Sequence, residues 1–133
     1  MILIDANIFM YAAGRESPQR LPCQRFLEGT VAGEGPAACT DAEVLQEILH
    51  RYRSLENPEI GFRLFDAVTR LGIPILAVTE RSLSLARTLL EDHPSLSTRD
   101  GVHLGVMLEH GIEEVLSYDR GLSQVSWVKR LEA

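Results

Sequence analysis

A chain of 133 residues, of which 45% are hydrophobic, is long enough for one compact domain with a buried core and too short for two. Its formal net charge of −6 argues against a protein that binds nucleic acid by covering phosphates with a broad basic face. The same charge is compatible with a cluster of carboxylates that holds magnesium. No apolar run approaches the roughly 20 residues that a membrane-spanning helix needs, so we expect no membrane association.

The cysteines and the N-terminus indicate where the protein works. Cys23 and Cys39 lack the spacing of a zinc site or of a disulfide framework, which favours reduced thiols. No basic segment precedes the first apolar residues, and Asp5 interrupts them, so the N-terminus does not have the pattern of a signal peptide. We therefore expect a cytoplasmic protein with a single domain over residues 1–133.

The first third of the chain alternates apolar and amphipathic segments. Residues 1–4 predict a short buried strand, and residues 36–39 predict a second. A serine–proline pair is typical of a helix start and begins a predicted helix over residues 17–32. The segment TDAE at residues 40–43 matches a capping box, with Thr40 as the cap of a helix that has one apolar face.

The rest of the chain continues this alternation. It predicts helices over residues 57–72, 79–93 and 97–111, and strands over residues 74–78 and 114–117, with 125–128 as a candidate fifth strand. Strands that alternate with helices argue for a parallel sheet with helices on both faces. We therefore predict an α/β fold, a three-layer α/β/α domain around a central parallel sheet of four to five short strands.

Four carboxylates lie close to the predicted strand ends. Asp5 follows the first strand and Asp119 follows the fourth. Glu47 lies in the first two turns of the helix after the second strand, and Asp100 begins the helix before the fourth. Parallel sheets bind ligands at the carboxyl ends of their strands, so these four acids are candidates for one site. Magnesium takes oxygen ligands, and paired ions activate water for attack on a phosphodiester.

Each acid also has an ordinary structural explanation. Asp5 suits a helix N-cap, and Asp119 suits a turn after a strand. Asp100 lies three residues after a serine and suits a capping box, and Glu47 could form a surface ion pair with Arg51. One such explanation is easy to accept, but four acids at these places in one architecture favour a shared site.

Three segments resemble the PIN-domain ribonucleases, and within them the VapC-like toxins of type II toxin–antitoxin modules. MILIDANIFMYA resembles the family's opening strand and Asp-x-Asn segment, and TDAEVLQEIL resembles its second acidic segment. STRDGVHLGVMLEHGIEEVLSYDRGL resembles the third and fourth segments and is the most specific match. The resemblance implies an endoribonuclease that depends on Mg2+, with Mn2+ as an alternative. It also implies that the catalytic metal ligands are Asp5, Glu47, Asp100 and Asp119.

The same resemblance implies an RNA substrate, a cognate antitoxin protein as partner and a homodimer. Asn7 is an accessory candidate that would orient a carboxylate or a water near Asp5, and Ser117 keeps the hydroxyl of a threonine common in the family. Arg99 and Arg120 neighbour predicted ligands and could hold RNA phosphates, with exposure to solvent as the alternative for both. Gly101 and Gly105 stand where the family usually has alanine, which should loosen their helix.

Two questions stay open at this stage. His103 lies three residues after Asp100 and could face the site, but we expect a histidine that packs in the core. The helix register also leaves open whether Glu43 joins Glu47 in the site.

Other functions fit the sequence less well. Phosphotransferases of the haloacid dehalogenase type and response-regulator receivers need a second acid near Asp5 and a mid-chain lysine, but Asn7 stands there and the only lysine is Lys129. The main competitor is a catalytically silent PIN scaffold that binds a partner. Loss of one or more acids would be its signature, and all four are present.

Overall fold

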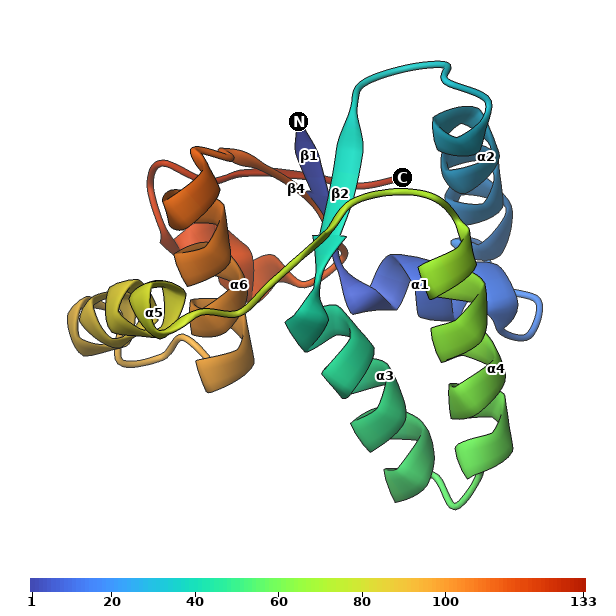
Figure 1. The fold of residues 1–133 in the computed structure, drawn as a ribbon, viewed down its shortest axis with the longest axis horizontal. Coiled ribbons are helices and arrows are strands. Elements are labelled where there is room, and N and C mark those ends of the chain that lie inside the picture. Colours follow the sequence, from blue (N-terminus) through green and yellow to red (C-terminus); the bar gives the residue numbers. More distant parts are fainter.

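A computed structural model describes residues 1–133 and contains a five-stranded, fully parallel sheet with helices on both sides (Figure 1). The strand order is β3-β2-β1-β4-β5, so β1 lies at the centre between β2 and β4. Leu3 of β1 pairs with Cys39 on one side and with Val115 on the other. The strands are β1 (Ile2–Ile4), β2 (Ala38–Asp41), β3 (Ile75–Leu76), β4 (Glu114–Leu116) and β5 (Lys129–Leu131).

Helices cover both faces of this sheet, which confirms the predicted α/β architecture. Figure 1 shows α5 and α6 on one side of the strands and α1 to α4 on the other. The helices are α1 (Ala6–Ala13), α2 (Arg20–Val31), α3 (Ala42–Ser54), α4 (Pro58–Arg70), α5 (Glu80–Asp92) and α6 (Thr98–His110), with a short 3-10 helix η1 (Arg120–Gln124) after β4. None of these helices has the length and apolar character needed to cross a membrane.

Two hydrophobic cores lie on the two faces of the sheet. Successive side chains of a strand point to opposite faces. Ile2 and Ile4 of β1 therefore join the core beneath α1 to α4, whereas Leu3 joins the core beneath α5 and α6. Full burial of an aliphatic side chain of this size contributes about 1.5–3 kcal/mol. The central strand is thus anchored from both sides, which holds the residue that follows it, Asp5, in a rigid frame.

The helix α1 was not among the predicted elements. Its eight residues follow β1 directly, and Asp5 is its N-cap, with the Asp5 side chain accepting a hydrogen bond from the Ala6 amide. Ile8 and Phe9 are buried against the core. A helix this short has too few turns for its periodicity to stand out from an apolar run, so the tertiary core stabilises it instead.

Two local predictions were wrong. The capping box of Thr40 and Glu43 does not form, because the N-cap of α3 is Asp41, whose side chain accepts a hydrogen bond from the Val44 amide at 2.9 Å. The Thr40 hydroxyl instead donates to the Ile4 carbonyl at 2.8 Å and ties β2 to β1. The fifth strand exists but covers Lys129–Leu131 rather than residues 125–128.

The glycines of α6 bring two helices close together. A Cβ atom on Gly105 would collide with the Ser82 carbonyl oxygen of α5, and one on Gly101 would lie 2.8 Å from the Leu90 side chain. Larger residues at these positions would push α5 away from α6. We had expected these glycines to loosen the helix, but in the structure they allow its close packing.

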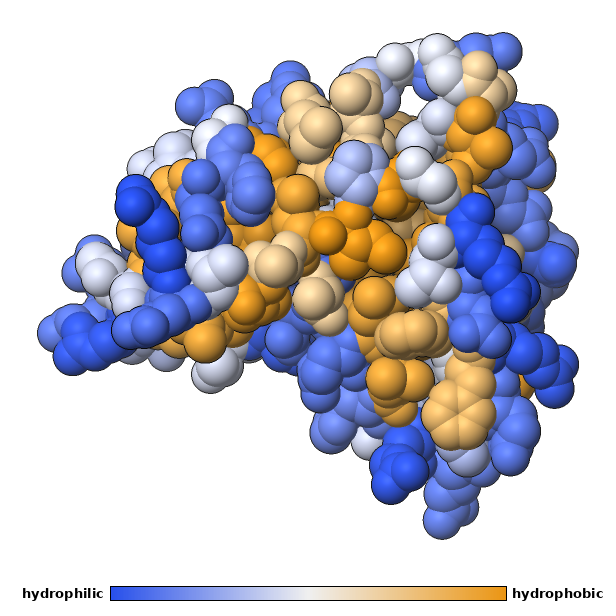
Figure 2. Space-filling view, viewed as in Figure 1, coloured by the Kyte–Doolittle hydropathy of each residue, from blue (hydrophilic) through white to orange (hydrophobic).

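The edge strand β3 presents apolar side chains to solvent. It pairs only with β2, and Ile73, Ile75, Leu76 and Val78 of this segment are only partly buried. Figure 2 shows hydrophobic residues gathered over the middle of this face, where the segment from α4 to α5 crosses the molecule. A contiguous apolar surface of this kind is typical of a protein-contact area.

Candidate active site

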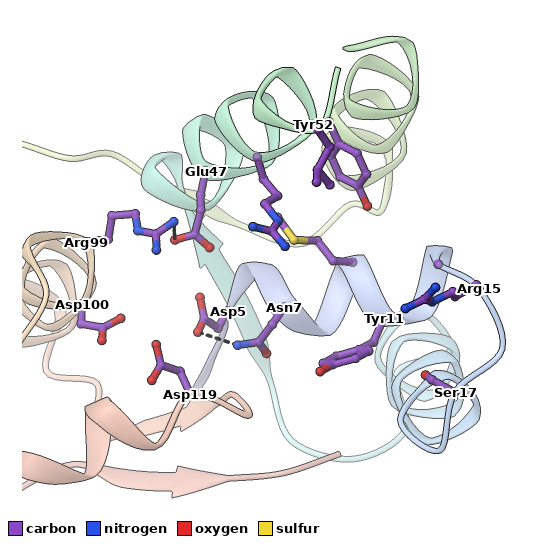
Figure 3. A pocket seen from close by; sticks show the side chains of 14 residues that line it. Asp5, Asn7, Tyr11, Arg15, Ser17, Glu47, Tyr52, Arg99, Asp100 and Asp119 are labelled. Carbon is purple, nitrogen blue, oxygen red and sulfur yellow. Dashed lines mark hydrogen bonds and ion pairs between the residues drawn. The ribbon is translucent and has the colours of Figure 1, made fainter. Parts of the chain in front are cut away.

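The four predicted acids line one pocket of about 530 Å³ (Figure 3). Asp5 and Asp119 come from the carboxyl ends of β1 and β4, Glu47 from α3 and Asp100 from α6. Figure 3 shows the acids gathered at one end of the pocket. The lining also includes three arginines and several uncharged residues, namely Arg15, Arg51, Arg99, Asn7, Met10, Tyr11, Gly14, Ser17, Tyr52 and Leu55.

Asp5 is buried and held by hydrogen bonds on both carboxylate oxygens. Its Oδ1 accepts from the Ala6 amide at 2.7 Å, and its Oδ2 accepts from the Ser117 hydroxyl at 2.6 Å and from the Asn7 side chain at 3.2 Å. Asn7 in turn accepts from the Tyr118 amide at 3.2 Å. The N-cap explanation of Asp5 is therefore correct, and it does not compete with a place in the pocket.

The environment of Asp5 disfavours its charged form. Burial raises the pKa of Asp5, although the nearby His103 and the hydrogen bond from Ser117 act in the opposite direction. The negative charge of Glu47 adds to the rise. A cation bound beside Asp5 would remove this penalty.

Glu47 faces the pocket rather than the outer surface of α3. Its side chain is 15% exposed and lies 3.4 Å from the Arg99 guanidinium. The surface pair with Arg51 that we considered is absent, because Arg99 of α6 takes that place. Since the Arg99 side chain is 53% exposed, this ion pair contributes little to stability. Glu43, one turn earlier, does not line the pocket.

Asp100 and Asp119 converge on the backbone of Gly121. Asp119 accepts a hydrogen bond from the Gly121 amide at 2.8 Å. A Cβ atom on Gly121 would lie 3.1 Å from Oδ2 of Asp100 and 3.1 Å from Oδ1 of Asp119, so the absence of a side chain keeps this space open. Burial, followed by the charges of Asp119 and Asp5, raises the pKa of Asp100 to about 6.

Asp41 was missed from the sequence, and His103 was considered for the site but was expected only to pack in the core. Asp41 and His103 are completely buried, and the ring Nδ1 of His103 lies 2.7 Å from Oδ2 of Asp41. The other ring nitrogen of His103 lies 3.6 Å from Oδ1 of Asp5 and 3.8 Å from Oε1 of Glu47. His103 is buried as expected, but it lies among carboxylates as well as apolar neighbours.

Available signals pointed to both residues. Asp41 ends β2 as Asp5 follows β1, and His103 lies one helical turn after Asp100. Burial disfavours a charged imidazole, but the charge and hydrogen bond of Asp41, followed by Glu47 and Asp5, hold the pKa of His103 well above its ordinary value. The carboxylates around His103 thus favour a positively charged group at its position.

The accessory candidates divide into two groups. Asn7 and Arg99 line the pocket, whereas Ser117 does not line it but donates a hydrogen bond from its hydroxyl to Asp5. Arg120 is exposed and does not line the pocket, so the structure does not bring it to the acids. Tyr11 and Arg15 were not predicted, and Figure 3 shows them with Ser17 at the end of the pocket away from the acids.

The residue types suit a metal ion. Asp5, Glu47 and His103 each offer one ligand atom, and these three atoms lie within 4.8 Å of one another. His103 Nε2 is buried and has no hydrogen-bond partner, and Gly121 leaves space between two further carboxylates. An acidic cluster with an unpartnered nitrogen and open space can accommodate a divalent cation.

Comparison with known proteins identifies the family. The model of the PIN domain matches residues 2–128. VapC ribonuclease Mb1869c from Mycobacterium bovis is 40% identical over 131 residues, which cover 98% of this chain and 99% of that protein. Ribonuclease VapC23 from Mycobacterium tuberculosis is 34% identical over 124 residues, which cover 92% of this chain and 96% of that protein.

Solved structures agree on the fold. Mycobacterium tuberculosis VapC20, described as a sarcin–ricin loop cleaving toxin, has a TM-score of 0.77 at 19% identity, covering 96% of this chain and 97% of that one. FitAcB from Neisseria gonorrhoeae has a TM-score of 0.72 at 18% identity, and the match covers 98% of this chain and 96% of that one. The chain therefore belongs to the PIN-domain family. Within that family it is one of the VapC ribonuclease toxins, which confirms the family and enzyme class predicted from the sequence.

Proposed function

We propose that this protein, as a single PIN domain over residues 1–133, hydrolyses RNA with Mg2+ or Mn2+ held by Asp5, Glu47, Asp100 and Asp119. The observation that carries the proposal is the convergence of these four acids, from four separate segments, on one pocket at the carboxyl ends of β1 and β4. Like charges at this density are unfavourable unless a cation offsets them.

The bound ion would supply an activated water and would offset negative charge on the phosphate during attack. The chain's own residues prepare the place for this chemistry. Ser117 and Asn7 orient Asp5 through hydrogen bonds at 2.6 and 3.2 Å. Because β1 is buried, Asp5 is held in position before substrate arrives.

RNA is the proposed substrate, and arginines in the pocket support it. Arg15, Arg51 and Arg99 line the same pocket as the acids. A guanidinium is the preferred side chain for bidentate contact with phosphate. These arginines would hold the phosphates on either side of the bond that is cut, while the acids act on the bond itself. This division explains how a chain with a net charge of −6 can bind RNA.

A cognate antitoxin is the proposed partner, and a homodimer the proposed assembly. Two structural relatives are described as a toxin–antitoxin complex from Klebsiella pneumoniae and as VapBC-1 from Haemophilus influenzae. The apolar edge at β3 and exposed side chains such as Phe62 on α4 offer surfaces for protein contact. A silent scaffold is disfavoured, because none of the four acids is replaced.

The test is cleavage of structured RNA in Mg2+ or Mn2+, with EDTA as the metal-free control. We expect the wild-type protein, free of antitoxin, to cut RNA, and Asp5→Asn and Glu47→Gln to lose this activity while remaining folded. Asp66→Asn and Glu59→Gln are matched controls, because both residues are exposed on α4 and neither lines the pocket. Cutting that survives EDTA, or that persists in both pocket variants, would overturn the proposal.

A further inference from the structure

One atom in the site lacks a partner. Nε2 of His103 is buried and has no hydrogen bond. Leaving a buried polar atom unsatisfied costs about 1–3 kcal/mol, so such atoms are rare and call for an explanation. Its nearest polar neighbours are Asp5 and Glu47, two of the acids proposed as ligands, and both lie beyond hydrogen-bond distance.

The distances around Nε2 suit coordination better than hydrogen bonding. Oδ1 of Asp5 lies at 3.6 Å and Oε1 of Glu47 at 3.8 Å, both longer than an effective hydrogen bond. Two ligand atoms that are each about 2.1 Å from one ion lie roughly 3.0 to 3.4 Å apart at octahedral to tetrahedral angles. Small side-chain movements would bring all three atoms to that separation.

Asp41 holds the His103 ring in the orientation that coordination needs. Its Oδ2 lies 2.7 Å from Nδ1 of His103, while its Oδ1 accepts from the Val44 amide at 2.9 Å. With the Nδ1 hydrogen donated to Asp41, a cation that displaces the proton from Nε2 binds the lone pair that is left there. Metal-binding histidines almost always donate their other ring N–H to such a carboxylate or carbonyl. The surrounding carboxylates also favour a divalent cation at this point more strongly than a single proton.

We propose that His103 is a nitrogen ligand of the cation held by Asp5 and Glu47, and that Asp41 is its positioning residue. This inference rests on the proposed function, because it adds a ligand to the same site. Imidazole suits transition metals such as Mn2+, Co2+ and Zn2+, whereas Mg2+ prefers oxygen ligands. The site therefore selects Mn2+ over Mg2+ more strongly than carboxylates alone would.

The direct test is pulsed electron paramagnetic resonance of Mn2+ bound to the whole protein. Nitrogen bonded to Mn2+ modulates the spin echo, and labelling histidine with 15N changes that modulation. We expect a histidine nitrogen signal in the wild type and in His110→Gln, whose histidine is exposed in the last turn of the same helix. We expect the signal to be absent in His103→Gln.

Calorimetric titration tests the selectivity. We expect Asp41→Asn to weaken Mn2+ binding by about 10- to 100-fold, because the ring loses the partner that orients it. His103→Gln should weaken Mn2+ binding by at least as much and Mg2+ binding by much less. Equal losses for both ions in His103→Gln would contradict the inference.

The outcomes separate this inference from the proposed function. Mn2+ that binds, depends on Asp5 and shows no histidine nitrogen would overturn the role of His103 and leave the nuclease proposal in place. Mn2+ that does not bind, or binds equally to Asp5→Asn, would overturn both. If His103→Gln does not fold, a variant with His50, His93 and His110 all replaced by glutamine keeps His103 as the sole histidine, and loss of the signal there would overturn the inference.

Discussion

The deep and outer parts of the site differ in how far the fold has already arranged them. In the deep part, Asp5, Asp41 and His103 are at most 4% exposed, and each is fixed by hydrogen bonds to another element or to a helix N-terminus. In the outer part, Asp119 is exposed and bonds only to a neighbouring backbone amide, and Arg99 is half exposed.

This difference suggests a division of work. Rigid groups in the deep part set the position of the cation, because they cannot move without disturbing the core. Exposed groups in the outer part have room to adjust to an RNA strand as it enters. Substitutions in the deep part should therefore affect metal binding and stability most. In the outer part, Arg99 should affect substrate binding, and Asp119 should affect metal binding less than Asp5 does.

The largest expected effect comes from the acid at the centre of the deep part. Asp5→Asn keeps the shape of the side chain but removes a ligand charge. Electrostatic stabilisation by a bound ion is worth several kcal/mol, so we expect activity to fall roughly 100-fold or more. Asp119→Asn should reduce activity by a smaller factor, because the Asp119 side chain is exposed. Single-turnover cleavage rates measure both, and an equal loss in the two variants would remove the distinction between the two parts.

A smaller effect is expected where a buried hydroxyl supports Asp5. Ser117 donates to Asp5 at 2.6 Å and accepts from Asn7 at 3.0 Å, so Ser117→Ala leaves buried groups unsatisfied. We expect a loss of about 1–3 kcal/mol in the free energy of unfolding. Urea unfolding measures it, with Ser126→Ala as the control in a segment that does not line the pocket. An unchanged unfolding free energy would show that Asp5 is not held in this way.

The pH dependence of stability should reverse when metal binds. The pKa of Asp100 is raised to about 6, so without metal the folded state binds this proton more tightly than the unfolded state. Stability from this group is full at low pH and is lost as the pH rises through about 6. Asp5 and His103, whose pKa values are also raised, act in the same direction.

Saturating Mn2+ should produce the opposite slope, because the ion binds ionised acids. Melting temperatures between pH 4 and 8, with EDTA or with Mn2+, test this. Asp100→Asn should flatten the metal-free slope. The same slope with and without the ion would mean that these acids do not bind it.

The smallest expected effect distinguishes two arginines that each adjoin a proposed ligand in the sequence. Arg99 lines the pocket and lies 3.4 Å from Glu47, whereas Arg120 does not line it. Arg99→Ala should raise the KM for RNA several-fold through loss of a phosphate contact, which corresponds to about 1 kcal/mol of binding free energy. Arg120→Ala should leave KM within error. Steady-state kinetics on one RNA substrate compares the two, and a larger effect of Arg120 would place the RNA path elsewhere.

The predictable part of the site followed from sheet geometry. Asp5 and Asp119 stand at strand ends, and parallel strands bring their carboxyl ends to one edge, so their convergence could be expected from the chain alone. The helix positions of Glu47 and Asp100 could be added because each helix adjoins that edge. The order of strands and helices could be predicted because apolar and amphipathic segments alternate along the chain.

The missed part depended on contacts between distant segments. Asp41 and His103 are separated by 62 positions, and nothing local to either residue shows that they touch. Asp41 also lies in a segment with a plausible local explanation, the capping box of Thr40 and Glu43. That explanation placed the predicted N-cap at Thr40, one residue before the observed N-cap at Asp41. The short helix α1 was missed because the core stabilises it more than its own periodicity does.

The most direct test of the account is calorimetric titration of Mn2+ into the antitoxin-free protein and into Asp5→Asn. We predict a saturable binding event in the wild type and its loss in Asp5→Asn, with Asp119→Asn retaining weakened binding. No binding in the folded wild type, or the same affinity in Asp5→Asn, would contradict the claim that the buried acids of this pocket form a cation site.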